Sequence, residues 1–272
     1  MPEGPEVKVM ANQIDSGFKG KVLQEIHIGS KSRYFKKPLS NLDEFRKLLP
    51  RKLSRVYSRG KKIIFIFEGD VFMVTSLGME GHFLLSPRQH SGFCLDFDGE
   101  GEYLYFDDSR HFGSHEFFFS QPSLDVRLSD LGLDLLNEEV TFEMWHETLE
   151  RARKRGGNKQ ITKYLLDQDR VCGIGNYLRA EILYAARIAP SRTLNSLSLE
   201  DSRLLWSESV RILHESYRCG GHTLATYVDA YGNPGTFEVK VYRGFADPEG
   251  RLIKSEVFSD GRTTWWCPEV QI

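Results

Sequence analysis

The sequence predicts a multidomain α+β chain: an N-terminal antiparallel β-sandwich with flanking helices, then a helical domain and a β-hairpin. Three observations predict it. The chain has 272 residues, enough for more than one core. Short β-type segments separated by turn residues crowd its first half, and apolar stripes at helical spacing fill much of the second half. Hydrophobic residues at 40% and charged residues at 27% are ordinary for a globular protein.

The first predicted domain spans residues 1–125. After Pro5, apolar residues at helical spacing predict an amphipathic helix that stops near Gly17 to Gly20. That stripe consists of Val7, Met10, Ala11, Ile14 and Phe18. Turn residues then separate the predicted strands 62–68, 71–77, 92–97 and 103–108. Several short strands close together predict an antiparallel sandwich.

A linker is predicted at 126–138, and a helical domain at 139–225. Thr141 is a potential cap for a first helix, and helical stripes follow at 161–166 and 178–186. Ser198 opens a fourth helix, with Asp201 three residues on as a capping box. That helix is expected to stop at Gly220–Gly221, because glycine readily adopts the left-handed conformation that ends helices.

The predicted C-terminal part, 226–272, is β-type again and contains a loop and a hairpin. Alternating Phe237, Val239 and Val241 indicate a strand. Segments 252–258 and 263–267 flank Ser259-Asp260-Gly261-Arg262, a turn with Asp-Gly chemistry, and so predict a hairpin.

Charge is neutral overall but locally basic. The net charge of −2 gives no global argument for nucleic acid. Two stretches, 51–62 and 151–163, nevertheless hold basic residues and no acidic one, which suits either a one-sided contact with phosphates or two solvated surfaces. Their basic residues are Arg51, Lys52, Arg55, Arg59, Lys61 and Lys62, and Arg151, Arg153, Lys154, Arg155, Lys159 and Lys163.

Other compositional features exclude some classes of protein. No apolar run approaches the roughly 18 residues of a membrane span, and the N-terminus does not read as a signal peptide. We therefore expect no membrane partner and an intracellular location. Four cysteines lie far apart with no C-x-x-C pair, so we expect reduced thiols and neither a metal site nor a cofactor.

Pro2 follows the initiator methionine, whose removal leaves a secondary amine at the start of the chain. An α-amine has a pKa of about 7.7–8.0 against about 10.4 for lysine, so it keeps a usable unprotonated fraction at neutral pH. Unprotonated amines attack aldehyde-like carbons. Glu3 and Glu6 lie beside it and supply carboxylates for proton transfer. Taken alone, the same residues equally describe a helix start that complements the helix dipole.

Four distant segments together give a resemblance. MPEGPEV (1–7), SRGKK (58–62), GIGNYLRAEILYAARIAP (173–190) and GRTTWW (261–266) stand in order across the whole chain. They resemble the formamidopyrimidine-DNA glycosylase and endonuclease VIII family, including its helix–two-turn–helix signature. The match looks closest to the endonuclease VIII-like branch with a zincless finger. Of the cysteine pairs that hold zinc in relatives, only Cys267 remains.

The resemblance implies the catalytic roles. Pro2 resembles the nucleophile, and Glu3 the acid/base that assists sugar opening and elimination. Glu6 resembles a supporting carboxylate. Lys61 resembles the lysine that contacts the phosphate beside the lesion.

The resemblance also implies the DNA-binding residues. Asn176 and Lys163 resemble phosphate contacts, and Arg262 resembles the finger arginine. Met79 resembles the wedge that fills the void left by a flipped nucleotide. In the segment DSRHFG, Arg110, His111 and Phe112 resemble the rest of this DNA-binding set, with Arg110 and Phe112 as partners of the wedge.

The implied function is that of a bifunctional DNA glycosylase and abasic-site lyase of base excision repair, acting as a monomer on duplex or single-stranded damaged DNA. A Pro2 Schiff base with β,δ-elimination would remove oxidised pyrimidines and hydantoins. One alternative is a purine-preferring glycosylase that acts on 8-oxoguanine or formamidopyrimidines. Another is a damaged-DNA-binding protein without catalysis. The lesion-facing loop is expected near 229–238, and its glycines indicate mobility.

Overall fold

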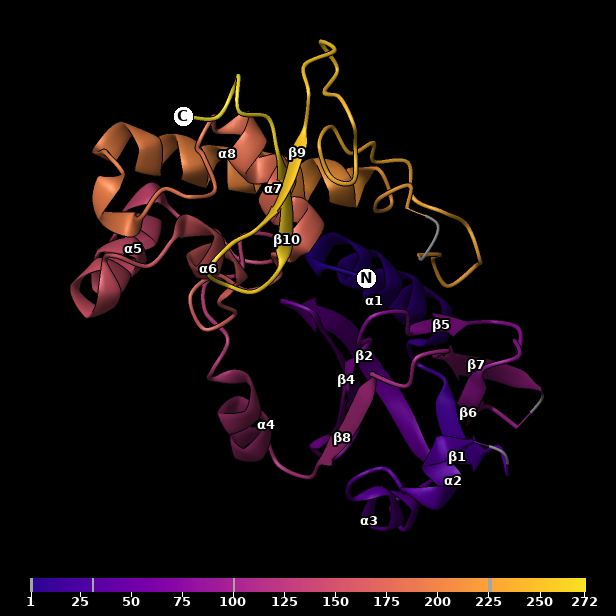
Figure 1. Ribbon diagram of the computed structural model, residues 1–272. Coiled ribbons are helices and arrows are strands. Elements are labelled where there is room, and N and C mark those ends of the chain that lie inside the picture. Colours follow the sequence, from indigo (N-terminus) through magenta and orange to yellow (C-terminus); the bar gives the residue numbers. More distant parts are fainter. Residues whose placement is uncertain (1, 31, 100, 225–226) are drawn as a thin grey trace. The chain divides into compact units, whose positions relative to one another are not determined.

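The computed structural model (Figure 1) describes residues 2–30, 32–99, 101–224 and 227–272. The chain forms two compact units. The first unit comprises Met1–Ser129 and Cys219–Thr236, and the second comprises Asp130–Arg218 and Phe237–Ile272. Among the described residues, no helix combines the length and the apolar character that a bilayer crossing requires.

The division of the chain differs from the predicted boundaries at one segment. Residues 219–236 return to the first unit, whereas the sequence pattern divided them between the helical domain and the hairpin part. Hydrogen bonds explain the return. The backbone N–H of His222 donates to Glu6, and that of Ala230 donates to Gln13.

The first unit is built on eight antiparallel strands in the order β5-β7-β6-β1-β2-β3-β4-β8. The strands are β1 (Val22–Ile28), β2 (Arg51–Arg59), β3 (Lys62–Phe67), β4 (Val71–Ser76), β5 (His82–Leu84), β6 (Ser91–Phe97), β7 (Glu102–Asp107) and β8 (Ser114–Phe118). β1 and β2 are joined through Val22–Lys52 and Leu23–Arg51 alone, so the sheet divides there into two halves. The two halves share one apolar core, in which the rings of Phe65 and Phe83 lie 5.5 Å apart between centroids. The predicted antiparallel sandwich is confirmed.

Helix α1 (Gly4–Phe18) packs against β2 and β3 of this sandwich (Figure 1). Its predicted stripe is buried, including Val7, Met10 and Ile14. Pro5 stands in the first turn, where the missing N–H costs no helical hydrogen bond. Three shorter helices lack a periodic stripe long enough to predict: α2 (Arg33–Lys36), α3 (Leu42–Arg46) and α4 (Gln121–Leu128).

The second unit is mainly helical, as predicted. It contains α5 (Phe142–Gly156), α6 (Ile161–Leu166), α7 (Asn176–Ala185), the 3₁₀ turn η1 (Leu194–Ser196) and α8 (Leu199–Arg218). The Thr141 hydroxyl accepts the Met144 N–H at 3.4 Å. At the start of α8, the N–H of Ser198 donates to the Asp201 carboxylate at 2.8 Å, and the N–H of Asp201 donates to the Ser198 hydroxyl at 3.0 Å. Both predicted caps are therefore confirmed.

The chain ends in the predicted hairpin of β9 (Lys254–Val257) and β10 (Thr263–Trp266), which we call the finger (residues 254–266). Four antiparallel pairs join its strands, from Thr263–Val257 to Trp266–Lys254. The predicted strand at 237–241 is wrong. The backbone N–H groups of residues 240–242 donate to the carboxylate of Glu181 instead of a neighbouring strand.

Candidate active site

The start of α1 gathers three of the predicted site residues. Pro2 is buried immediately before the helix, and Glu3 is its N-cap residue. Glu3 and Glu6 are 1% and 0% exposed. The backbone N–H of Glu3 donates to Glu6 Oε2 at 2.8 Å, which fixes the chain directly after Pro2. Met1, whose removal is predicted, lies outside the described residues.

The second oxygen of Glu6 ties α1 to the returning segment 219–236. Glu6 Oε1 accepts the backbone N–H of His222 at 3.0 Å. Gly221 has φ +98°, and a Cβ atom there would lie 2.9 Å from Glu6 Cγ and 2.7 Å from the Tyr227 ring, so only glycine fits. Burial, with the Glu6 carboxylate as a second cause, raises the pKa of Tyr227 and keeps its hydroxyl neutral. Glu6 therefore holds two backbone segments at one carboxylate.

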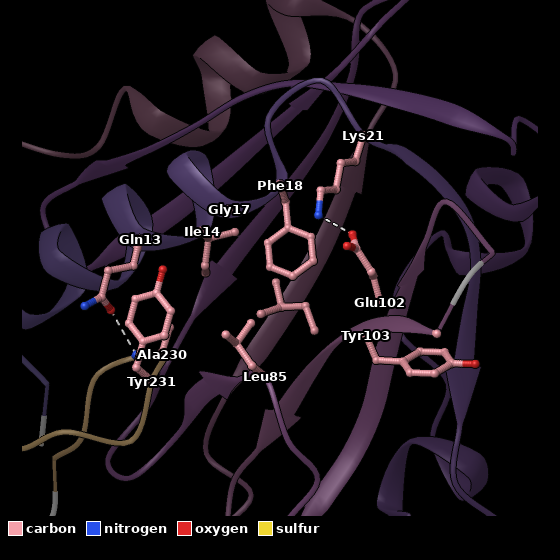
Figure 2. Close-up of a pocket in the computed structure, with 12 residues that line it drawn as sticks. Gln13, Ile14, Gly17, Phe18, Lys21, Leu85, Glu102, Tyr103, Ala230 and Tyr231 are labelled. Atoms are coloured by element: carbon pink, nitrogen blue, oxygen red, sulfur yellow. Dashed lines mark hydrogen bonds and ion pairs between the residues drawn. The ribbon is translucent and has the colours of Figure 1, made fainter.

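The predicted lesion-facing loop is also hydrogen-bonded to α1. Figure 2 shows Gln13 reaching the backbone of Ala230, whose N–H donates to its side-chain oxygen at 2.9 Å. The Gln13 side-chain N–H donates to Asp229 at 2.8 Å, and Asp229 in turn accepts the N–H of Asn233 at 2.8 Å. A cavity of about 260 Å³ lies between this loop, α1 and the start of β7. The loop is thus anchored at its first residues, although its glycines suggested mobility.

Lys61 occupies the tight turn between β2 and β3. Gly60, before it, has φ +54°, and Arg59 pairs with Lys62 across the strands. Lys61 is half-buried in this turn. For the neighbouring Lys62, burial is the main cause of a lowered pKa, with Arg127 as the second cause.

Two loops bring the predicted void-filling residues together. Gly78 has φ +66°, and a Cβ atom there would lie 2.5 Å from the carbonyl carbon of Phe112, so the two loop backbones touch. Met79 and Phe112 are 37% and 57% exposed, and the Arg110 guanidinium lies 5.4 Å from the centre of the Phe112 ring. The Met79 side chain, an aromatic ring and a cation thus lie on two exposed loops that touch.

Asp108 holds the loop that carries Arg110, His111 and Phe112. Its buried carboxylate accepts the backbone N–H groups of Arg110, His111 and Gly113 at 3.2, 3.0 and 2.7 Å. His111 itself has φ +57° and an exposed side chain. The loop therefore holds its exposed side chains on a rigid backbone.

The second unit brings two further predicted residues together. Asn176 opens α7, and Gly175 rather than Asn176 is its N-cap residue. The Asn176 side-chain N–H donates to the carbonyl of Thr263 at 3.1 Å, beside the exposed Arg262. A helix N-terminus with free backbone N–H groups attracts anions, and a guanidinium beside it suits a phosphate.

Lys163 lies on the exposed face of α6, beside a small hollow that is also lined by Arg155, Lys159 and Arg170. Three residues of the second predicted basic cluster, Arg155, Lys159 and Lys163, therefore lie around one hollow, which Asp167 also lines.

Several functional side chains were not predicted from the sequence. They are Gln13, Asp108, Arg179, Glu181 and His222. One signal for two of these residues was available in the sequence. Arg179 and Glu181 are two charged residues in the otherwise mainly apolar run NYLRAEILYA. Cys267 is buried among apolar side chains of the second unit, next to Val270. Over the described ranges, no three His, Cys, Asp or Glu side chains are grouped so that they could hold a metal ion.

Comparisons with known proteins agree in family. A model described as the formamidopyrimidine-DNA glycosylase N-terminal domain matches residues 1–115, and one described as its H2TH domain matches residues 131–228. Formamidopyrimidine-DNA glycosylase of Thermus thermophilus is 32% identical, covering 100% of this chain and 98% of its own.

Solved structures give the same result. The crystal structure of the MutM (Fpg) protein of Thermus thermophilus matches with a TM-score of 0.85 at 31% identity, covering 99% of this chain and 98% of that one. Wild-type Lactococcus lactis Fpg in complex with DNA containing an oxidised pyrimidine matches with a TM-score of 0.85 at 27% identity, covering 99% of each chain. These names do not distinguish the endonuclease VIII-like branch.

Proposed function

The chain belongs to the formamidopyrimidine-DNA glycosylase family, and from this premise we propose that it excises damaged bases from DNA and cleaves the resulting abasic site, with Pro2 as nucleophile. The observation that carries the proposal is the buried start of α1. There Glu3 and Glu6 are buried shortly after Pro2, whose nitrogen becomes the first of the chain.

The proposed reaction runs through a covalent bond to deoxyribose. The Pro2 nitrogen attacks C1′ while Glu3 transfers a proton to the ring oxygen, and the bond to the damaged base breaks. The resulting iminium acidifies the C2′ proton, whose loss expels the 3′ phosphate. A second elimination expels the 5′ phosphate, and hydrolysis frees the amine. Lys61 is proposed to contact the phosphate beside the lesion.

The DNA contacts divide between the two units. In the first, Met79, Arg110 and Phe112 are proposed to fill the space of the flipped nucleotide, with His111 contacting the same DNA. In the second, the phosphate contacts are proposed to come from Lys163, Asn176 and Arg262.

The names of the relatives support the alternative substrate range. The family model and the relative from Thermus thermophilus are named for formamidopyrimidine, a ring-opened purine, and this supports the purine-preferring alternative over the oxidised pyrimidines and hydantoins that the sequence resemblance suggested. The relative solved with an oxidised pyrimidine in its DNA keeps pyrimidine lesions as the second candidate. We propose formamidopyrimidines and 8-oxoguanine as the main substrates.

A panel of duplexes, each with one lesion, tests the proposal. Single-turnover excision is measured on formamidopyrimidine, 8-oxoguanine, an oxidised pyrimidine and a hydantoin. Faster excision of the first two supports the purine preference, and faster excision of the last two reverses it. An enzyme that binds all four but cleaves none contradicts catalysis.

Replacement of Phe112 with alanine is expected to weaken binding to a duplex that carries a tetrahydrofuran abasic analogue. Loss of one stacking ring costs about 1–3 kcal/mol. Fluorescence anisotropy titration measures this change. Phe119→Ala is a matched control, because Phe119 is also exposed but follows the opposite end of β8. Equal affinities of the Phe112→Ala and Phe119→Ala variants would show that Phe112 does not contact DNA.

Replacement of Arg262 with alanine is expected to weaken DNA binding about equally for damaged and undamaged duplexes. The dependence of log Kd on log salt should fall by about 1, because one phosphate contact is lost. Titrations at several salt concentrations measure both quantities. A variant with the wild-type salt slope would show that the finger turn does not contact phosphate.

A further inference from the structure

One buried guanidinium connects the two predicted phosphate contacts of the second unit. Arg179 is 0% exposed and projects from the first turns of α7. One of its terminal nitrogens donates to Asn176 Oδ1 at 2.6 Å and to the Thr264 hydroxyl at 2.6 Å. Its other terminal nitrogen forms an ion pair with Asp260, whose side chain is 6% exposed. The same carboxylate accepts the backbone N–H of Arg262 at 2.9 Å.

A buried charge of this kind is costly to leave unpaired, so it enforces one arrangement of its partners. The planar guanidinium reaches acceptors on two elements at once, which a lysine ammonium on its single flexible stem does not do. The finger turn therefore cannot shift relative to the N-terminus of α7 without leaving Arg179 or Asp260 buried and uncompensated.

A second charge on α7 holds the chain that leads to the finger. Glu181 is 3% exposed and accepts three backbone N–H groups, from Lys240, Val241 and Tyr242, at 2.8, 3.0 and 2.9 Å. Burial raises the pKa of Glu181, against the lowering effect of these hydrogen bonds. In addition, Trp265 packs on Tyr242 with ring centroids 4.7 Å apart. Glu181 and the Trp265–Tyr242 contact thus hold the chain before the finger and its second strand. The position of the turn at the finger tip then depends on Arg179.

We propose that Arg179 is a positioning residue for DNA binding. Through Asp260 and Asn176 it sets the separation between Arg262 and the N-terminus of α7, so that both engage the DNA backbone at adjacent phosphates. The proposal rests on the proposed function only in taking DNA as the ligand. Arg179 itself is buried and does not touch DNA.

The test compares Kd and its salt dependence for a duplex with a tetrahydrofuran abasic analogue. The variants are Arg179→Met, Asp260→Asn, Arg262→Ala and the double variant of Arg179→Met with Arg262→Ala. Asp260→Asn keeps an acceptor for the Arg262 N–H but removes the charge that pairs with Arg179. It therefore tests the positioning role of Arg179 even if Arg179→Met does not fold. Arg251→Met is the matched control. Arg251 forms ion pairs with Asp247 at 2.7 Å and with Glu249 at 2.6 Å, and neither residue belongs to the finger turn.

Arg179→Met is expected to raise Kd roughly tenfold, as loss of a charge-assisted phosphate contact would, and to lower the salt slope by about 1. Asp260→Asn changes both quantities in the same direction, and Arg251→Met changes neither. The double variant binds within about twofold of Arg262→Ala, because Arg179 acts through Arg262.

Two results would overturn the inference. One is a wild-type Kd and salt slope in Asp260→Asn. The other is a double variant whose loss is the product of the two single losses, since that would make Arg179 independent of Arg262. Borohydride trapping at saturating abasic DNA separates this inference from the proposed function. Absence of trapping in the wild type refutes the lyase, while the binding comparison still decides the role of Arg179.

Discussion

Replacement of Pro2 with threonine is expected to abolish the borohydride-trapped complex with abasic DNA and to slow base excision by a factor on the order of 10³ or more. The reason is the nitrogen. The iminium of a secondary amine has no N–H proton to lose and stays charged, whereas the iminium of a primary amine can lose its proton and become a neutral imine. Proline also holds that nitrogen in a rigid ring directly before α1. Pro2→Gly is expected to act in the same direction.

The matched control is Pro5→Thr. Pro5 lies in the first turn of the same helix, where threonine is tolerated, so trapping should remain. A second control places additional residues before Met1, which converts the Pro2 nitrogen permanently into an amide. Wild-type turnover in the Pro2→Thr or the extended protein would remove Pro2 from the mechanism.

Replacement of Glu3 with glutamine is the second large effect. Glutamine has the shape of glutamate but cannot transfer the proton, so excision of a damaged base is expected to fall about 10²–10⁴-fold. Trapping on abasic DNA should fall less, because that sugar is already partly an open aldehyde. Single-turnover assays on the two substrates measure the difference, and DNA affinity should stay near the wild-type value.

Glu25→Gln serves as the control for Glu3. It makes the same chemical change at a side chain that is 58% exposed on β1. Excision at the wild-type rate by Glu3→Gln would show that Glu3 is not the acid/base residue.

Local signals predicted much of the fold. The periodic stripes of α1, α5 and α8 and the caps Thr141 and Ser198 appear where the sequence placed them. Strands β1 and β2 were missed because their exposed positions carry charges such as Glu25 and Arg55 and leave few apolar residues to alternate. At 237–241 an alternating pattern was present, but a carboxylate on a distant helix took the hydrogen bonds of its last two residues.

The sequence predicted those site residues that stand in contiguous motifs and missed those that are brought together only by folding. Pro2, Glu3 and Glu6 are neighbours in the chain. The contact between Glu6 and His222 spans 216 positions, and that between Arg179 and Asp260 spans 81. Nothing local specifies such pairings. They arise only when the returning segment and the finger pack within their own units.

The most direct test of the central claim is to locate the covalent bond. Wild-type protein is incubated with abasic DNA and borohydride, the adduct is digested, and peptides are sequenced by mass spectrometry. We predict that the reduced deoxyribose is attached to the nitrogen of Pro2 in a peptide that no longer carries Met1. Attachment to a lysine such as Lys61, or a trapped protein that retains Met1, would contradict the account.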